Sequence, residues 1–104
     1  MLDKVNDDHA PVLITRQQGK PALRFDPDAW HDHLHWQSTD KAVARRINGL
    51  FKEILRDPYV GTGKPEPLKH GLSGWWSRRI TAEHRLVYRL AGETVEVAKL
   101  RCHY

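Results

Sequence analysis

Residues 41–56 read KAVARRINGLFKEILR, and their apolar side chains recur every three or four positions. The apolar positions are Val43, Ile47, Leu50, Phe51, Ile54 and Leu55. This spacing places them on one stripe of an α-helix, with lysine and arginine over the remaining surface. Asp40 stands where a helix N-cap is favoured, and Asp57-Pro58 ends the pattern. We therefore predict a helix over residues 41–56 whose apolar stripe packs against a second layer.

A second helix is predicted immediately upstream of the first. Asp26 is suited to its N-cap, and Pro27 is suited to its first helical position. Trp30, His33 and Leu34, followed by Trp36 or Gln37, recur at helical spacing, so we expect them on one face of this helix.

Extended segments account for the rest of the pattern. Apolar and β-branched residues favour strands at residues 11–15, 22–25, 75–80, 84–90 and 94–102. The first two flank a turn that contains glycine, and the last three are joined by short connectors, so antiparallel hairpins are expected. One hairpin, two helices and three strands make an α+β fold, in which an antiparallel sheet packs against two helices.

The composition bounds the class of protein. With 104 residues the chain is long enough for one domain with a modest core. Its net charge of +4 favours a polyanionic partner such as nucleic acid. Cys102 is the only cysteine, which excludes an intrachain disulfide, and no apolar run approaches the roughly 20 residues of a membrane helix. The N-terminus also lacks a signal-peptide core, so we expect a cytoplasmic protein.

Residues 63–70 read GKPEPLKH and hold a carboxylate between two prolines. Pro65 and Pro67 each fix a backbone angle and favour extended geometry before them, so Glu66 is presented rigidly. Lys64 and Lys69 favour its ionised form, which could accept a proton. Taken alone, such a pattern is more often a surface loop with a solvated acid.

Alternation along the last two predicted strands gathers basic side chains on one face of the sheet. That face would hold Arg85, Val95, Val97, Lys99, Arg101 and His103. RNA can be cut without a metal when its 2′-hydroxyl attacks the adjacent phosphate, a step that needs a base, cations and an acid. Glu66 could be the base, Arg85 could hold the phosphate, and His103 could be the acid.

Three features admit another interpretation. His31, His33 and His35 could bind a metal on a strand, but on the predicted helix only the outer two align, and solvated histidines are favoured. Trp75-Trp76 could stack on bases, although core packing is the commoner role. The last two residues of the chain could instead form a frayed tail.

Several runs together make the sequence similar to a known family. They are WQSTDK (36–41), GKPEPLKH (63–70), LSGWWSRRIT (72–81), EHRLVY (83–88) and the terminal HY (103–104). Over residues 21–104 the chain resembles the YoeB toxins, a branch of the RelE-like bacterial toxins. The resemblance implies a fold similar to that of small microbial ribonucleases. It also implies an endoribonuclease that cuts mRNA in the ribosomal A site without a metal or other cofactor.

The resemblance also implies roles for individual residues. Glu66 corresponds to the general base, Arg85 to a phosphate-binding arginine, His103 to the general acid and Tyr104 to a substrate contact. Further substrate contacts are expected from Lys64, Lys69, Arg79, Lys99 and Arg101. The implied partners are mRNA, the 70S ribosome and a YefM antitoxin. The resemblance is also compatible with a homodimer.

Residues 1–20 form an extension outside this resemblance. The run DHAPVLITRQQGKPA (8–22) resembles an internal segment of the YefM antitoxins. It suggests a fusion that left an antitoxin fragment ahead of the toxin domain at 21–104, and an unrelated tail is the alternative. We expect residues 12–15 to add an edge strand. Such a fusion could also be an inactive remnant that binds antitoxin or nucleic acid without catalysis, which is the alternative function.

Overall fold

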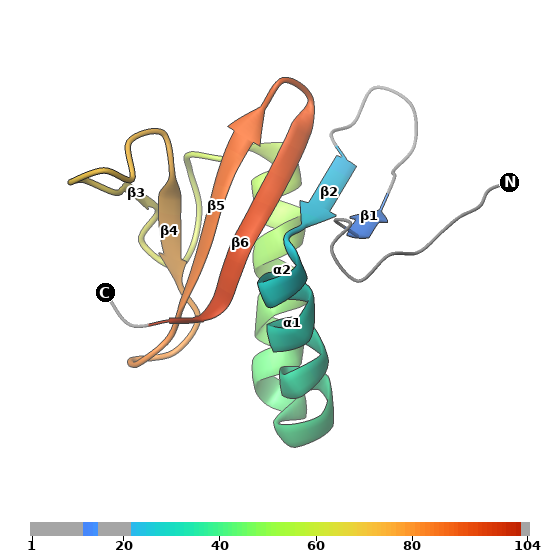
Figure 1. The fold of residues 1–104 in the computed structure, drawn as a ribbon. Coiled ribbons are helices and arrows are strands. Elements are labelled where there is room, and N and C mark those ends of the chain that lie inside the picture. Colours follow the sequence, from blue (N-terminus) through green and yellow to red (C-terminus); the bar gives the residue numbers. More distant parts are fainter. Residues whose placement is uncertain (1–11, 15–21, 103–104) are drawn as a thin grey trace, which may run out of the picture.

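One mixed sheet and two helices make up the fold (Figure 1). The computed structural model describes residues 12–14 and 22–102. In chain order the elements are β1 (Val12–Ile14), β2 (Ala22–Phe25), α1 (Pro27–Thr39), α2 (Lys41–Arg56), β3 (Glu66–Pro67), β4 (Trp76–Arg79), β5 (Arg85–Ala91) and β6 (Thr94–Cys102). The helices pack on one face of the sheet, which confirms the α+β architecture. We call the opposite face of the sheet the outer face.

The strand order in the sheet is β1-β2-β6-β5-β4-β3. Neighbours are antiparallel at every pairing except one, because β2 runs parallel to β6, with Leu23 opposite Val95. The expected antiparallel sheet is therefore a mixed sheet. The chain passes through both helices and a three-stranded meander before it returns to the side of β2, and a long crossover of this kind permits parallel pairing. The predicted N-terminal hairpin is confirmed in the backbone pairing of Val12 with Phe25.

Helix α2 begins and ends at the predicted residues, and α1 begins at Pro27 as the sequence indicates. The Asp40 carboxylate accepts a hydrogen bond of 3.2 Å from the Val43 N–H and so caps α2. Asp26 occupies the N-cap position of α1, but its side chain makes no capping hydrogen bond. Within the described part of the chain, neither helix is long and apolar enough to cross a membrane.

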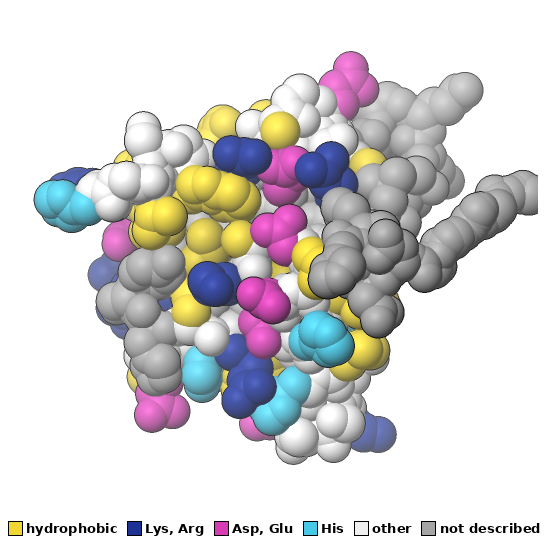
Figure 2. All heavy atoms as spheres, viewed as in Figure 1, with side chains coloured by type: hydrophobic (Ala, Val, Ile, Leu, Met, Phe, Trp, Pro, Cys, Tyr) yellow, Lys and Arg dark blue, Asp and Glu magenta, His cyan; other side chains and the backbone are white. Residues whose placement is uncertain are grey.

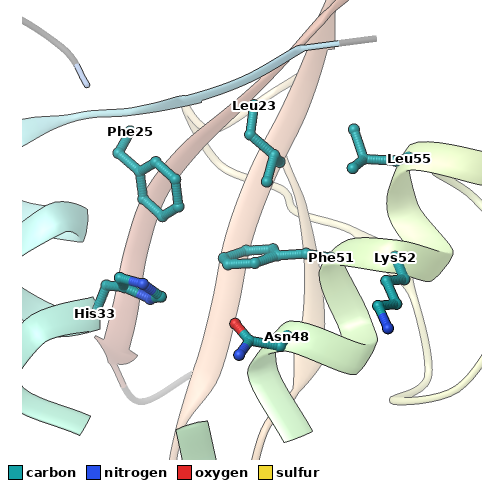
Figure 3. Close-up of a pocket in the computed structure, with 7 residues that line it drawn as sticks. All are labelled: Leu23, Phe25, His33, Asn48, Phe51, Lys52 and Leu55. Carbon is teal, nitrogen blue, oxygen red and sulfur yellow. The ribbon is translucent and has the colours of Figure 1, made fainter. Parts of the chain in front are cut away.

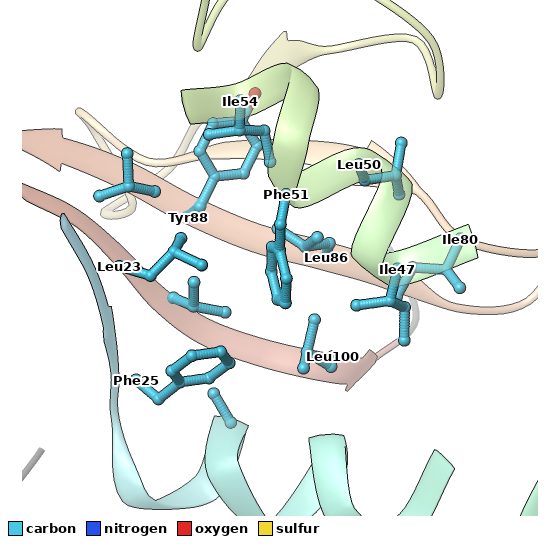
Figure 4. Close-up of a cluster of buried hydrophobic side chains, with 13 residues drawn as sticks. Leu23, Phe25, Ile47, Leu50, Phe51, Ile54, Ile80, Leu86, Tyr88 and Leu100 are labelled. Atoms are coloured by element: carbon cyan, nitrogen blue, oxygen red, sulfur yellow. The ribbon is translucent and has the colours of Figure 1, made fainter. Parts of the chain in front are cut away.

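The core lies between α2 and the inner face of the sheet (Figure 4). Leu50 and Ile54 of α2 pack with Leu86 and Tyr88 of β5 and with Leu100 of β6. Each of these side chains is 2 % exposed or less. Burial of large apolar side chains contributes about 1.5–3 kcal/mol each, so this layer fixes the sheet to the helices.

Beyond the end of β2, side chains of helix α1 form hydrogen bonds with the backbone of β6. Asp32 accepts a 3.0 Å hydrogen bond from the Leu100 N–H, and the Trp36 indole donates to the Leu100 carbonyl at 2.9 Å. These two side chains satisfy backbone groups that a further strand would otherwise pair. Among the residues expected on one face of α1, Trp30 and Trp36 pack against the core, whereas Leu34 is 44 % exposed.

Two irregularities in the pairing of β6 with β5 change the face on which some β6 side chains lie, so the expected assignment of faces was partly wrong. The pairing with β5 shifts between Arg85 and Val87 and again between Val87 and Tyr88. Val95 and Val97 are fully buried in the core rather than on the basic face, although Lys99 is exposed as expected. An extra residue at a β-bulge reverses the alternation beyond it, which strict two-residue periodicity cannot anticipate.

Candidate functional site

Glu66 and Arg85 meet on the outer face of the sheet. The two residues of β3 pair with β4, and Glu66 lies opposite Ser77, which in turn lies opposite Val87. Paired residues project to the same face, so the Glu66 carboxylate points toward the Arg85 side chain. Arg85 Nη1 lies 3.4 Å from Glu66 Oε1 and donates a 3.1 Å hydrogen bond to Ser77 Oγ. The structure thus brings together two of the three predicted catalytic groups.

The two side chains differ in exposure. The Arg85 side chain is 16 % exposed and that of Glu66 is 52 % exposed. Within the described residues, no hydrogen bond uses Nε or Nη2 of Arg85. A partly desolvated guanidinium with free donors is suited to bind a phosphate, and the open carboxylate beside it can accept a proton.

The backbone before Glu66 is held by a close approach to β4. Gly63 and Lys64 both have positive φ, at 84° and 52°. The Arg79 N–H donates a 2.6 Å hydrogen bond to the Gly63 carbonyl, and a Cβ added at Gly63 would lie 3.0 Å from the Arg79 carbonyl oxygen. Glycine is therefore required at this position, because it tolerates both the conformation and the contact.

Arg78 anchors the loop that leads to this segment. Its guanidinium is fully buried and donates to the carbonyls of Asp57, Val60 and Thr62 at 3.0–3.2 Å. It also donates to Glu53 Oε1 at 3.2 Å and to the Tyr88 hydroxyl at 3.1 Å.

Glu53 completes this anchor from α2. Its two carboxylate oxygens accept 2.7 Å hydrogen bonds from the N–H and the hydroxyl of Thr62. These bonds, followed by the charge of Arg78, lower the pKa of the Glu53 carboxyl.

The other predicted substrate contacts are distributed around the pair. Arg79 pairs with Arg85 across β4 and β5, and Lys99 pairs with Val87, so both belong to the outer face. The side chains of Lys64, Lys69 and Arg101 are exposed. Cys102, the last residue of β6, pairs with Arg85. His103 and Tyr104 lie outside the described residues.

The histidines of α1 do not form a metal centre with one another. The His33 ring stacks on Trp30 with centroids 5.3 Å apart and also contacts Phe25 and Phe51. Burial lowers the pKa of His33. Among the described residues, no group of three or more acidic, cysteine or histidine side chains could hold a metal ion.

A pocket of about 220 Å³ lies beside His33, between β2 and the two helices (Figure 3). Leu23, Phe25, Phe51 and Leu55 supply most of its lining. The described residues that line it include no carboxylate and no arginine, so we place the candidate site on the outer face instead.

Sequence reasoning missed Ser77 and Arg78 as residues of the site. Their signal lies in the run WSRR of β4, where successive side chains alternate between faces. If Arg79 belongs to the outer face, Ser77 shares that face and Arg78 points inward. A charged inward residue requires several buried acceptors, and here the loop carbonyls supply them.

The comparisons with known proteins agree with one another. Residues 25–104 match the YoeB-like toxin of bacterial type II toxin-antitoxin system. The toxin YoeB of Mycobacterium bovis is 57% identical over 83 residues, which are 80% of this chain and 98% of that toxin. The toxin YoeB of Escherichia coli K12 is 52% identical over 79% of this chain and 98% of that toxin. The antitoxin YefM of Streptomyces coelicolor is 29% identical over 59 residues, 55% of this chain and 68% of that antitoxin.

Solved structures show the same similarity. A YoeB/ParE toxin from Agrobacterium tumefaciens has a TM-score of 0.75 and 48% identity, over 79% of this chain and 98% of that one. A YoeB dimer and a heterotetrameric YoeB-YefM complex from Staphylococcus aureus have TM-scores of 0.75 and 0.74, each with 42% identity over 79% of this chain and 95% of theirs. The chain therefore belongs to the YoeB family of toxins of bacterial type II toxin-antitoxin systems.

Proposed function

We propose that this toxin is an endoribonuclease that cuts mRNA in the A site of the translating ribosome, by attack of the RNA 2′-hydroxyl on the adjacent phosphate. The observation that carries the proposal is the contact between Glu66 and Arg85, 3.4 Å apart on the outer face. A carboxylate beside a phosphate-binding guanidinium is the minimal pair for this chemistry. Side chains can supply the base, the cations and the acid, so the step requires no metal ion.

In the proposed step, Glu66 takes the proton of the 2′-hydroxyl while the oxygen attacks phosphorus. Arg85 stabilises the negative charge that develops on the phosphoryl oxygens, with Arg79 and Lys99 on the same face. The bond from phosphorus to the 5′-oxygen then breaks, and His103 supplies the proton that the leaving oxygen needs. The products are a 2′,3′-cyclic phosphate and a 5′-hydroxyl.

We assign the acid role to His103 because the family that the chain resembles has its general acid at this position. We propose that Tyr104 contacts the substrate, together with Lys64, Lys69 and Arg101, as in the family that the chain resembles.

The openness of the site supports the ribosomal setting. The Glu66 side chain is 52 % exposed on the outer face, and Lys64 and Lys69 on either side of it in the chain are exposed as well. An open site of this kind gives little orientation to a flexible RNA strand, and correct orientation contributes much of the rate. We infer that the ribosome holds the mRNA in position.

We further propose that the chain pairs with a YefM-like antitoxin and forms a dimer, as the Staphylococcus aureus proteins do in their structures. Residues 1–20 are proposed as an extension ahead of the toxin domain at 21–104. Similarity to a YefM antitoxin gives weak support to an antitoxin origin for the extension.

The test is translation of a defined message in vitro with purified toxin, followed by mapping of the cut ends. We expect cuts within A-site codons that leave a 2′,3′-cyclic phosphate and a 5′-hydroxyl. A 2′-deoxy substitution at the nucleotide that supplies the attacking hydroxyl should abolish the cut. The variants Glu66→Gln, Arg85→Ala and His103→Ala should each lower the rate by about 100-fold or more.

Exposed Arg45 on α2 offers a matched control, and Arg45→Ala should cut like the unmodified toxin. Products with a 5′-phosphate would contradict 2′-hydroxyl attack. A folded toxin that leaves the message intact would instead support the non-catalytic remnant.

A further inference from the structure

Arg89 lies on the outer face at a distance from the proposed catalytic pair. It follows Arg85 by four residues on β5, so the two side chains share a face about 13 Å apart at roughly 3.3 Å per residue. Its guanidinium carbon lies 4.4 Å from the centroid of the Trp75 ring. The side chain is 44 % exposed, whereas Trp75 beneath it is half-buried.

A buried carboxylate fixes Arg89 from its other side. Arg89 Nε donates to Glu96 Oε1 at 2.5 Å, and Arg24 Nη2 lies 2.7 Å from Glu96 Oε2. Glu96 pairs with Arg89 on β5 and with Arg24 on β2, so the three residues cross three neighbouring strands. Figure 2 shows such an arrangement over the upper part of the sheet, with one acidic side chain between two basic ones.

This cluster retains binding capacity. Two arginines and one carboxylate leave a net charge of +1, and the terminal nitrogens of Arg89 make no hydrogen bond within the described residues. A guanidinium held between an indole and a carboxylate has already lost its rotamer entropy, so a ligand would not have to order it.

The cluster also leaves one of its own buried hydrogen-bond donors without a partner among the described residues. This donor is the Nε of Arg24. An unpaired buried donor costs about 1–3 kcal/mol, which offsets part of what the two ion pairs contribute. A role in strand pairing alone therefore accounts poorly for two arginines here.

We propose that Arg89, held by Trp75 and Glu96, binds a backbone phosphate of single-stranded RNA that lies across the outer face. The proposal deepens the proposed function, since it adds a binding position for the same substrate class away from the scissile phosphate. At about 3.4 Å per stacked nucleotide, the 13 Å between Arg85 and Arg89 corresponds to about four nucleotides. An arginine stacked on an aromatic ring is well suited to such a contact, because its planar edge still offers donors to phosphate.

The test measures RNA binding apart from cleavage. The full-length Glu66→Gln protein is titrated with a fluorescent single-stranded RNA of about ten nucleotides, by anisotropy at several salt concentrations. Adding Arg89→Ala should weaken binding about five- to tenfold and reduce the salt slope by about 0.7, the value for one phosphate contact. Adding Arg45→Ala, which removes the same charge from α2, should change neither quantity beyond error.

One further variant and a measurement of stability separate binding from folding. Arg89→Lys keeps the charge but loses the planar fork, so it should recover most of the salt slope and only part of the affinity. Thermal unfolding of each variant shows whether the sheet is intact. If Arg89→Ala binds RNA like Arg45→Ala, or if the Glu66→Gln protein binds no RNA at low salt, the proposal is overturned. Neither result bears on cleavage, which the mapped ends of the message test separately.

Discussion

Replacing Arg78 with methionine should destabilise the toxin more than any single change on its outer face. Methionine fills a similar volume without a charge, so the change removes five donated hydrogen bonds and little packing. The carbonyls of Asp57, Val60 and Thr62 would lose their donor, and the loop that they hold leads directly to Glu66.

The size of the effect follows from the burial of the arginine. Removing one partner of a buried charged network costs about 3–5 kcal/mol. The side chain of Glu53 is 26 % exposed and keeps its bonds to Thr62, and Val60 is exposed, so water can replace part of the loss. We therefore expect the low end, about 3 kcal/mol, which lowers Tm by about 12–24 °C for a domain of this size.

Urea unfolding followed by tryptophan fluorescence measures the free energy of unfolding directly, since the chain has four tryptophans. Arg45→Met on the exposed surface of α2 is the control and should stay within about 0.5 kcal/mol of the unmodified toxin. Hydrogen exchange should become faster at residues 57–64 in Arg78→Met. A loss of less than about 1 kcal/mol, with unchanged exchange in that loop, would refute the anchoring role of Arg78.

Three other outcomes follow from the structure. Gly63→Ala should cost about 1–2 kcal/mol in urea unfolding, because its positive φ and the nearby Arg79 carbonyl oppose a side chain; unchanged stability would show that the backbone relaxes. Glu53→Gln should make the free energy of unfolding fall less steeply in acid. The pKa of Glu53 is lowered in the folded state, so its contribution to stability disappears as pH falls from about 4.3 through that lower value. A plot of stability against pH that is parallel to that of the unmodified toxin would contradict this. His33→Phe should flatten the profile just below about pH 6.5, where the unfolded histidine takes up a proton that the folded ring, with its lowered pKa, resists; an equally steep profile would argue against burial as the cause.

The sequence predicts the helices well because local signals determine them. The apolar stripe, the Asp40 cap and the stop at Asp57-Pro58 all act within a few residues, and α2 has the predicted bounds. The parallel pairing of β2 with β6 and the short strand β3 depend on contacts between distant segments. No local pattern encodes such contacts, so β3 was expected only as a rigid loop.

The candidate site divides in the same way. Glu66 and Arg85 were predicted from chemistry and resemblance, and the structure brings them together. Arg78 and Ser77 emerge only when the register of β4 is known, because that register decides which of two adjacent arginines faces the core. Their roles therefore depend on tertiary structure rather than on residue type.

The bulges of β6 allow Val97 and Leu100 to be buried while Lys99 lies on the outer face, which strict alternation would not permit. Val97 and Leu100 are both fully buried, yet they are separated by three residues, an odd number that regular alternation would send to opposite faces. The extra residue near Ala98 restores Leu100 to the core and leaves Lys99 on the outer face, opposite Val87. Without it, regular alternation from Val97 would place Lys99 in the core and Leu100 on the outer face. We infer that the change of phase between Val97 and Ala98, visible in the sequence as two adjacent apolar residues, allows one strand to serve both the core and the basic face.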